Sequence, residues 1–227
     1  MTTTIPSQTL PEIIYPDSDG KPMSDNTKQF QLIVKIQGGI DALFKDHENV
    51  FVAGDLLWYP VEGDNKTCQA PDTMVVFGRP KGYRGSYQQW LEDNIAPQVV
   101  FEIISPGNRM GTIFKLFKFY DNYGVEECYF YDLKDNELMG WVRSDGELNY
   151  IESMEGWVSP RLQTRFETAS GDLEIYRPDG LKFLSYVELS RQMEQEREEK
   201  ELVQQKADRL SEKLREMGIN PEEIWNF

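Results

Sequence analysis

Apolar residues are clustered in short runs that predict strands, and these runs are separated by helical patterns. Four runs are rich in β-branched and aromatic residues and are bounded by Pro, Gly, Asn or Ser, as strands commonly are. They cover residues 51–59, 70–77, 98–106 and 125–132. Between the last two runs, apolar positions recur three or four residues apart, which predicts a helix from about Met110 to Tyr123 that stops at Gly124. This strand–helix–strand order predicts a crossover between parallel strands of one sheet.

Another helix is predicted before these strands. Residues 24–26 can cap it, and its pattern continues to about Lys45. Gly38 and Gly39 lie in the middle of this segment and lower its intrinsic helix propensity. Its apolar face is expected to contain Phe30, Ile33, Val34, Ile40 and Leu43.

Shorter strands with tight turns are predicted after residue 132. Residues 138–143 are expected to pair with 147–152, and residues 161–167 with 173–176. Both pairs are expected to extend the sheet by antiparallel pairing. The predicted fold class is therefore α/β (α+β), with a mixed β-sheet flanked by helices.

The last part of the chain is a charge-rich helical segment with a continuous heptad seam. Its seam positions are separated by alternating steps of four and three residues, which is the spacing of a coiled coil. They are Leu189, Met193, Glu196, Lys200, Val203, Ala207, Leu210, Leu214 and Met217. Two interpretations remain open: a short coiled coil that makes the protein a homodimer, or a lone amphipathic helix that folds onto the body. Gly218 and Pro221 end the segment.

These patterns divide the chain into four parts. We expect an irregular N-terminal arm over residues 1–24, a mixed-sheet domain over 25–184, a charged helix over 185–217 and a tail over 218–227. No apolar run reaches the ~20 residues that a membrane helix needs, so no membrane partner is expected. The N-terminus has no basic stretch followed by an apolar one, so no signal peptide is expected.

Composition excludes several classes of site. The single histidine, His47, argues against Ser-His-Asp hydrolases and against zinc sites with several histidines. Two cysteines, Cys68 and Cys128, are expected to be free thiols in a reducing cytoplasm. The formal net charge of -15 repels nucleic acid, so any nucleic-acid binding must use a local basic patch.

Two acids on predicted strands are the candidate chemistry. Glu102 interrupts the apolar run 99–104, and Asp72 begins the run before it. A buried carboxylate needs a cation, a metal or hydrogen bonds to offset a desolvation cost of several kcal/mol, roughly. In one interpretation Asp72 caps a turn and Glu102 pairs with a base. In the other, Asp72, Glu102 and the carbonyl of Ile103 bind Mg²⁺ or Mn²⁺, which would activate water for hydrolysis.

A basic Gly-rich loop follows the first acid. Arg79, Lys81 and Arg84 lie in it, and further bases lie before and on the 110–123 helix at Arg109, Lys115 and Lys118. The loop is either an ordinary solvated turn or a surface that contacts phosphates of nucleic acid.

Three segments resemble the Uma-two family of restriction-endonuclease-like proteins, which belongs to the PD-(D/E)xK nuclease superfamily. They are Gln69-Ala70-Pro71-Asp72-Thr73-Met74-Val75-Val76, Val99-Val100-Phe101-Glu102-Ile103-Ile104-Ser105-Pro106, and Phe119-Tyr120 followed by Gly124-Val125-Glu126-Glu127. The resemblance covers about residues 22–178. It implies a restriction-endonuclease-like fold in which Asp72 and Glu102 are the metal-binding acids.

The chain departs from the family pattern at the expected lysine. In the superfamily a lysine commonly stands two residues after the second acid, and that position is Ile104 here. Members of the Uma-two family resemble one another in having this lysine on the following helix instead, four residues before a tyrosine. That tyrosine aligns with Tyr120, so the lysine position is Leu116 here. An acid often found four residues earlier is replaced by Thr112. Lys115 is adjacent, and Lys118 is a second substitute.

Three functions follow from these observations. The first is a Mg²⁺-dependent DNA endonuclease in which Asp72 and Glu102 hold the metal, Lys115 stabilises charge poorly, and Asp55 is a neighbouring acid. Its DNA contacts would be Arg79, Lys81, Arg84, Arg109 and Lys118. The second is a catalytically inactive binding or assembly protein that dimerises through residues 189–217. The third, a hydrolase of small phosphate compounds, has no substrate-pocket motif to support it.

Overall fold

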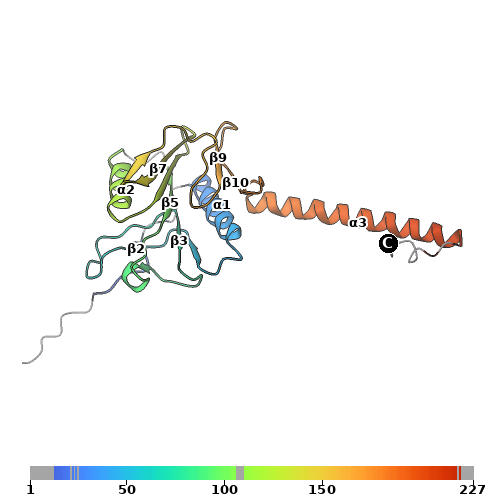
Figure 1. Cartoon of the computed structure of the whole chain (residues 1–227), viewed down its shortest axis with the longest axis horizontal. Helices are drawn as coiled ribbons and strands as arrows, with labels where there is room; N and C mark the ends of the chain where they lie inside the picture. Colours follow the sequence, from blue (N-terminus) through green and yellow to red (C-terminus); the bar gives the residue numbers. More distant parts are fainter. Residues whose placement is uncertain are drawn as a thin grey trace, which may run out of the picture. The chain divides into compact units, whose positions relative to one another are not determined.

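The structure is a computed structural model that describes residues 13–20, 22, 24, 26–105, 110–218 and 220. The chain divides into two compact units, Met1–Phe183 and Leu184–Phe227. The first unit contains a sheet with helices, and the second contains one long helix (Figure 1). Each unit is described by itself below.

A six-stranded mixed sheet forms the centre of the first unit. Its strand order is β1-β3-β5-β6-β7-β8, and neighbours are antiparallel except for the parallel pair β5 and β6. The strands are β1 (Val50–Ala53), β3 (Thr73–Phe77), β5 (Val99–Ile104), β6 (Glu127–Asp132), β7 (Glu137–Ser144) and β8 (Glu147–Tyr150). Helix α2 (Met110–Asn122) connects the parallel pair, so the predicted crossover and mixed sheet are confirmed.

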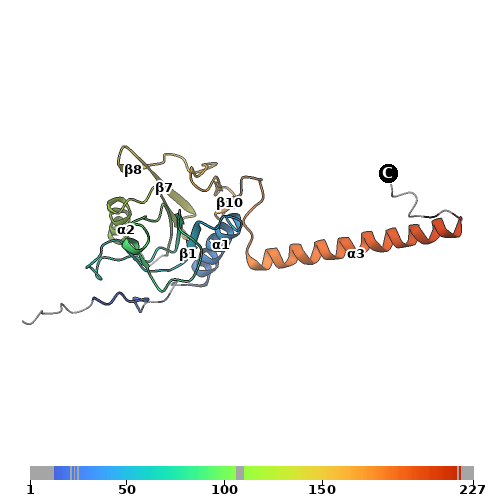
Figure 2. The same ribbon diagram turned by 60° about the horizontal axis from the view of Figure 1, so that its bottom comes forward.

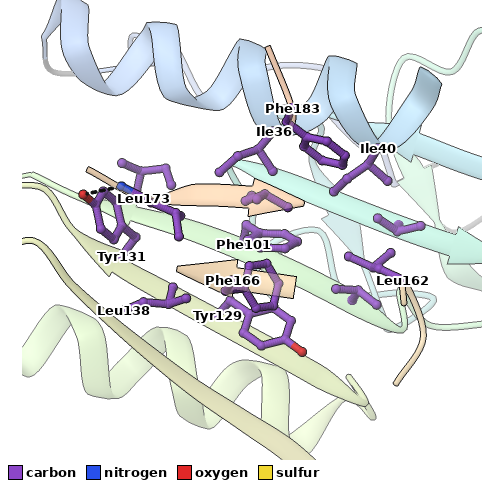
Figure 3. Packing of buried hydrophobic residues seen from close by; sticks show 14 of the residues in the cluster. Ile36, Ile40, Phe101, Tyr129, Tyr131, Leu138, Leu162, Phe166, Leu173 and Phe183 are labelled. Atoms are coloured by element: carbon purple, nitrogen blue, oxygen red, sulfur yellow. Dashed lines mark hydrogen bonds between the residues drawn. The ribbon is translucent and has the colours of Figure 1, made fainter. Parts of the chain in front are cut away.

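Helix α1 (Thr27–Leu43) covers one face of the sheet. The side chain of Asn26 caps it by accepting a hydrogen bond from the Gln29 amide. The buried stripe of α1 contains Ile33, Ile36 and Ile40, which pack against the odd-numbered residues of β5 in one core cluster (Figure 3). Phe30 and Val34 are 45% and 46% exposed, so the predicted apolar face was wrong at these two positions.

A two-stranded ribbon covers the rest of this face. It consists of β9 (Arg165–Glu167) and β10 (Glu174–Tyr176), and Phe166 and Leu173 lie in the same core cluster as α1 (Figure 3). The Leu173 amide donates a hydrogen bond to the Tyr131 hydroxyl of β6 at 3.1 Å. The two strands pair as predicted, but they form a separate sheet and do not extend the main one.

Helix α2 lies on the opposite face of the sheet from α1, as the two views in Figures 1 and 2 show. Its buried residues Leu116 and Tyr120 pack against even-numbered residues of β5 in a second core cluster. This face also contains the small parallel sheet of β2 (Trp58–Tyr59) and β4 (Tyr87–Gln88), which is followed by the 3₁₀ turn η1 (Gln89–Leu91).

The predicted strand over residues 51–59 is two strands. Val50–Ala53 belongs to the main sheet, and Trp58–Tyr59 belongs to the small one. The break contains Asp55, whose φ of 50 lies in the left-handed region that interrupts a strand. Pattern alone does not separate the two strands, because both are apolar.

Helix α3 (Tyr186–Glu216) makes up most of the described part of the second unit. It begins with a capping box, in which the Ser185 side chain accepts from the Glu188 amide and the Glu188 side chain accepts from the Ser185 amide. None of its residues is buried. Among the residues that the structure describes, no helix is long and apolar enough to cross a membrane.

Candidate active site

The two predicted acids lie side by side on the α2 face of the sheet. Thr73 of β3 pairs with Phe101 of β5, and extending this antiparallel register by one residue places Asp72 opposite Glu102. The Ile103 amide donates a hydrogen bond of 2.6 Å to Oδ2 of Asp72, which joins the two strands beyond their last ladder pair. Asp72 and Glu102 are 9% and 7% exposed. The structure therefore brings these two residues together in a nearly dry environment.

Glu102 has no basic partner among the groups that perturb it in the described chain. Burial raises its pKa well above the ordinary value, and the neighbouring charges of Asp72 and Asp55 raise it further. The hydroxyl of Tyr120 donates a short hydrogen bond to Oε1 of Glu102, which acts in the opposite direction. Among the described residues, Glu102 therefore does not pair with a base, which was one of the two interpretations of the sequence.

Asp55 is a third acid close to this pair. Its amide donates a hydrogen bond of 3.0 Å to the Pro71 carbonyl, which places it beside the start of β3. Burial raises its pKa, and it is half-buried. No group of three or more His, Cys, Asp or Glu side chains close enough to hold a metal ion occurs in the part of the chain that the structure describes. The candidate site is thus a pair of carboxylates with an acidic neighbour.

The backbone of Ile103 is held in place on both sides. Its carbonyl, the predicted third metal ligand, accepts a hydrogen bond of 3.0 Å from Nε2 of Gln29. A carbonyl oxygen has two lone pairs, so this bond occupies one of its two acceptor sites. Gln29 is a buried polar residue of α1 that the sequence analysis missed. The available signal was a glutamine four residues before Ile33, on the core-facing side of the helix.

Leu116 is the residue at which the resemblance described above leads us to expect a lysine. It is buried, and it lies one helical turn before Tyr120 in the same core cluster. Lys115, Lys118 and Thr112 are all exposed. The structure does not bring Lys115 to the acids, because a step of one residue turns the side chain by about 100° around the helix.

The basic loop is held by ion pairs within the protein. Arg79 and Arg84 both donate to Glu92, with closest distances of 2.8 and 2.6 Å. The side chains of these two arginines are only 16% and 12% exposed. Lys81 pairs with Asp41 at 2.5 Å. The loop is therefore neither a simple solvated turn nor an open set of phosphate-binding cations. Arg109, the remaining predicted contact, lies outside the described residues.

The donor set of this site suits a small divalent cation. Mg²⁺ prefers oxygen ligands and commonly uses one or two carboxylates together with water molecules. Asp72 and Glu102 supply those carboxylates, and the Ile103 carbonyl oxygen is a third oxygen donor whose one described hydrogen bond comes from Gln29. A cation here would also offset the mutual repulsion that contributes to the raised pKa of Glu102. The residues present fit the ion that the sequence analysis expected.

Comparison with known proteins identifies the family. The family model Uma2, described as "Putative restriction endonuclease", matches residues 21–169, which is more than half of the chain. The chain belongs to the Uma2 family. No curated protein matches it significantly.

Five chains of solved structures match this Uma2 protein. One is entitled "Crystal structure of a putative nuclease belonging to DUF820 from Anabaena variabilis ATCC 29413". Its sequence identity is 17% and its TM-score is 0.45, and the match covers 66% of this chain and 84% of that chain.

Two further acids of the Uma2 resemblance have a different role from Asp72 and Glu102. Glu126 forms a two-point ion pair with Arg161, with distances of 2.6 and 2.7 Å. Glu127 accepts hydrogen bonds from the Ser159 hydroxyl, the Arg161 amide and the Tyr129 hydroxyl. Glu127 pairs with Val99, at the other end of β5 from Glu102. These acids therefore attach the segment before β9 to β6 and lie apart from the candidate site.

Proposed function

We propose that this Uma2 protein is a Mg²⁺-dependent endonuclease that hydrolyses DNA phosphodiester bonds slowly. The observation that supports the proposal best is the buried pair Asp72 and Glu102, which come together where Asp72 enters β3 beside β5. Two carboxylates in such a place are costly to ionise unless a cation joins them. Membership of the Uma2 family adds the expectation of nuclease chemistry.

Asp72, Glu102 and the Ile103 carbonyl would hold the ion, and Mn²⁺ is expected to substitute for Mg²⁺. When bound, such a cation supplies a water molecule of lowered pKa and neutralises charge on a phosphoryl oxygen. The surrounding residues hold its ligands in fixed orientations. Tyr120 donates to Glu102, the Ile103 amide donates to Asp72, and Gln29 donates to the Ile103 carbonyl. Preorganised ligands of this kind cost little reorganisation during the reaction.

We expect turnover to be slow because Leu116 occupies the position where a lysine is expected. A lysine at this position would face the same core cluster as Tyr120 and would stabilise the charge that develops on the phosphate. Leucine cannot do this. Lys115 and Lys118 are exposed, so neither replaces it without movement of α2. We assign the DNA contacts to Lys118, to Arg109 and to the bases of the 79–84 loop. The loop bases bind DNA once its phosphates have displaced their acidic partners.

A second candidate function is a catalytically inactive nuclease-fold protein that acts as a binding or assembly module. Two observations favour it: Leu116 is buried where a lysine is expected, and Arg79 and Arg84 are already ion-paired with Glu92, Arg79 also with Asp93. A module of this kind retains any DNA affinity when metal is removed. An endonuclease loses turnover under the same condition.

A plasmid-nicking assay separates these two functions. We expect the wild-type protein to nick supercoiled plasmid in Mg²⁺ or Mn²⁺, and Asp72→Asn and Glu102→Gln to lose this activity. Glu147→Gln is a matched control, because Glu147 is an exposed acid on β8. Loss of nicking by both site variants, with the control active, supports an enzyme. Equal nicking by all variants, or its persistence in EDTA, contradicts the proposal.

We also place the protein in the cytoplasm. Among the described residues neither Cys68 nor Cys128 is in a disulfide, and Cys128 is buried. Cysteines outside disulfides suit a reducing compartment, where disulfides are rare.

A further inference from the structure

Most apolar residues in the seam of α3 are exposed. Tyr186, Leu189 and Met193 are 82%, 46% and 63% exposed near its start, and Val203 and Leu210 are 65% and 53% exposed further on. These residues follow the heptad spacing of a coiled coil. Water-exposed apolar stripes of this kind mark surfaces that bind a partner.

Charge is distributed unevenly along the same helix. Residues 186–201 contain six acidic and three basic residues, whereas residues 202–216 contain three acidic and four basic residues. The first half of α3 is therefore negative, and the second half is slightly positive. A second copy of the helix complements this pattern when it runs in the opposite direction.

We propose that α3 pairs with α3 of a second copy as an antiparallel coiled coil in which the two helices overlap along their full length. In this register Met193 lies opposite Leu210 of the partner subunit, and Leu189 lies opposite Leu214 of the partner subunit. The acidic first half of each helix then lies against the basic second half of the other.

The seam itself disfavours the parallel alternative. A parallel pair would place Glu196 against its own copy and Lys200 against its own copy in two successive layers of the core. Like charges that face each other across such a core are destabilising. In the antiparallel register, Glu196 lies opposite Ala207 of the partner subunit and Lys200 lies opposite Val203 of the partner subunit. Each charged side chain can then extend past a small residue to water.

Flanking positions select the same register. Glu199 and Lys206 are in equivalent positions beside the seam, and full antiparallel overlap brings Glu199 next to Lys206 of the partner subunit, twice in each dimer. An alternative register, shifted to pair Glu196 with Lys200 of the partner subunit, would place Glu199 against its own copy. It would also leave the apolar residues after Leu210 without a partner helix.

Disulfide trapping in the full-length protein tests this orientation. Two variants that each add one cysteine, Met193→Cys and Leu210→Cys, are made in a Cys68→Ser background, in which the buried Cys128 is the only native cysteine left. The antiparallel dimer predicts that an oxidised equimolar mixture forms a 193–210 disulfide, while neither variant alone forms a covalent dimer. Disulfide formation requires Cα atoms within about 7 Å. A covalent dimer of Met193→Cys alone, or no disulfide in the mixture, overturns the proposal.

Charge reversal gives an independent test by sedimentation equilibrium. We expect Glu199→Lys and Lys206→Glu each to raise the dimer dissociation constant about 5-fold, because each replaces two attractive pairs with repulsive ones. The double variant restores the wild-type value, because the reversed charges again face each other. A protein that is monomeric at all concentrations, or a double variant weaker than either single variant, contradicts the proposed arrangement.

Discussion

At the scale of single residues, the site depends on a carboxyl group that the apolar strand β5 holds away from water. Glu102 is costly to ionise there, and its only described hydrogen-bond donor is the Tyr120 hydroxyl. The pattern of short apolar runs was sufficient to predict that Glu102 interrupts a buried run and that Asp72 begins a neighbouring strand. This pattern could not predict Gln29 or Tyr120 as their supports, because both come from helices whose docking depends on tertiary packing.

Glu102→Gln is expected to stabilise the metal-free protein at neutral and alkaline pH. Since the folded-state pKa of Glu102 is raised, the folded protein binds a proton that the unfolded chain releases above the ordinary glutamate pKa. Wild-type stability is therefore lost as the pH rises from about 4.5 through the folded pKa. Glutamine removes this loss, because its oxygen can still accept from Tyr120. Thermal melts in EDTA across this pH range measure the difference.

The melts have a clear control in Glu147→Gln, which changes an exposed acid. The gap between Glu102→Gln and wild type should widen with pH, whereas the gap for the control should stay constant. A Glu102→Gln protein that is less stable than wild type at every pH would show that the buried carboxyl is satisfied in its ionised form.

Leu116→Lys is expected to increase plasmid nicking by about 10-fold or more in Mg²⁺. Removing a charge-stabilising donor from an active site typically costs about 10²–10³ in rate, so restoring one in a nearly correct position recovers part of that factor. Leu116→Met is the matched control, because it changes the side chain without adding charge. If both variants bind metal but nick at the same rate, the lysine position has been assigned wrongly.

At the scale of elements, helix α1 shows why a local pattern is insufficient. Gly38 and Gly39 lower helix propensity equally, but the packing of the helix requires a glycine only at position 39. A Cβ atom at Gly39 would lie 2.3 Å from the Phe183 ring, whereas a Cβ atom at Gly38 would meet nothing within 4 Å. The sequence predicted the helix but could not distinguish the two glycines, because Phe183 is far away in the chain. The same limit explains why β9 and β10 were assigned to the main sheet.

The two glycines predict opposite effects on the free energy of unfolding. Gly39→Ala is expected to destabilise the protein by about 1–3 kcal/mol, because the Phe183 ring must move in a packed core. Gly38→Ala is expected to stabilise it by about 0.5–1 kcal/mol through helix propensity alone. Urea denaturation measures both values. Equal effects of the two substitutions would contradict the packing of α1 against Phe183.

At the scale of the whole molecule, charge opposes the proposed substrate. The net charge of -15 makes DNA association dependent on local bases, and the described bases of the 79–84 loop are engaged with acids. Composition predicted this conflict, but only the structure identified the partners Glu92 and Asp41. The mixed sheet and the crossover were predictable from local patterns. The exposure of the bases was not, because ion pairing depends on side chains that are distant in sequence.

The most direct test is titration calorimetry of Mn²⁺ and Mg²⁺ on the wild-type protein, Asp72→Asn and Glu147→Gln. We expect one cation site in the wild type and in Glu147→Gln, and loss of that site in Asp72→Asn. Circular dichroism and thermal melts establish that the variants are folded. A wild-type protein that binds neither cation, or an Asp72→Asn protein that binds them as tightly as wild type, would contradict the assignment of Asp72 and Glu102 as a metal site.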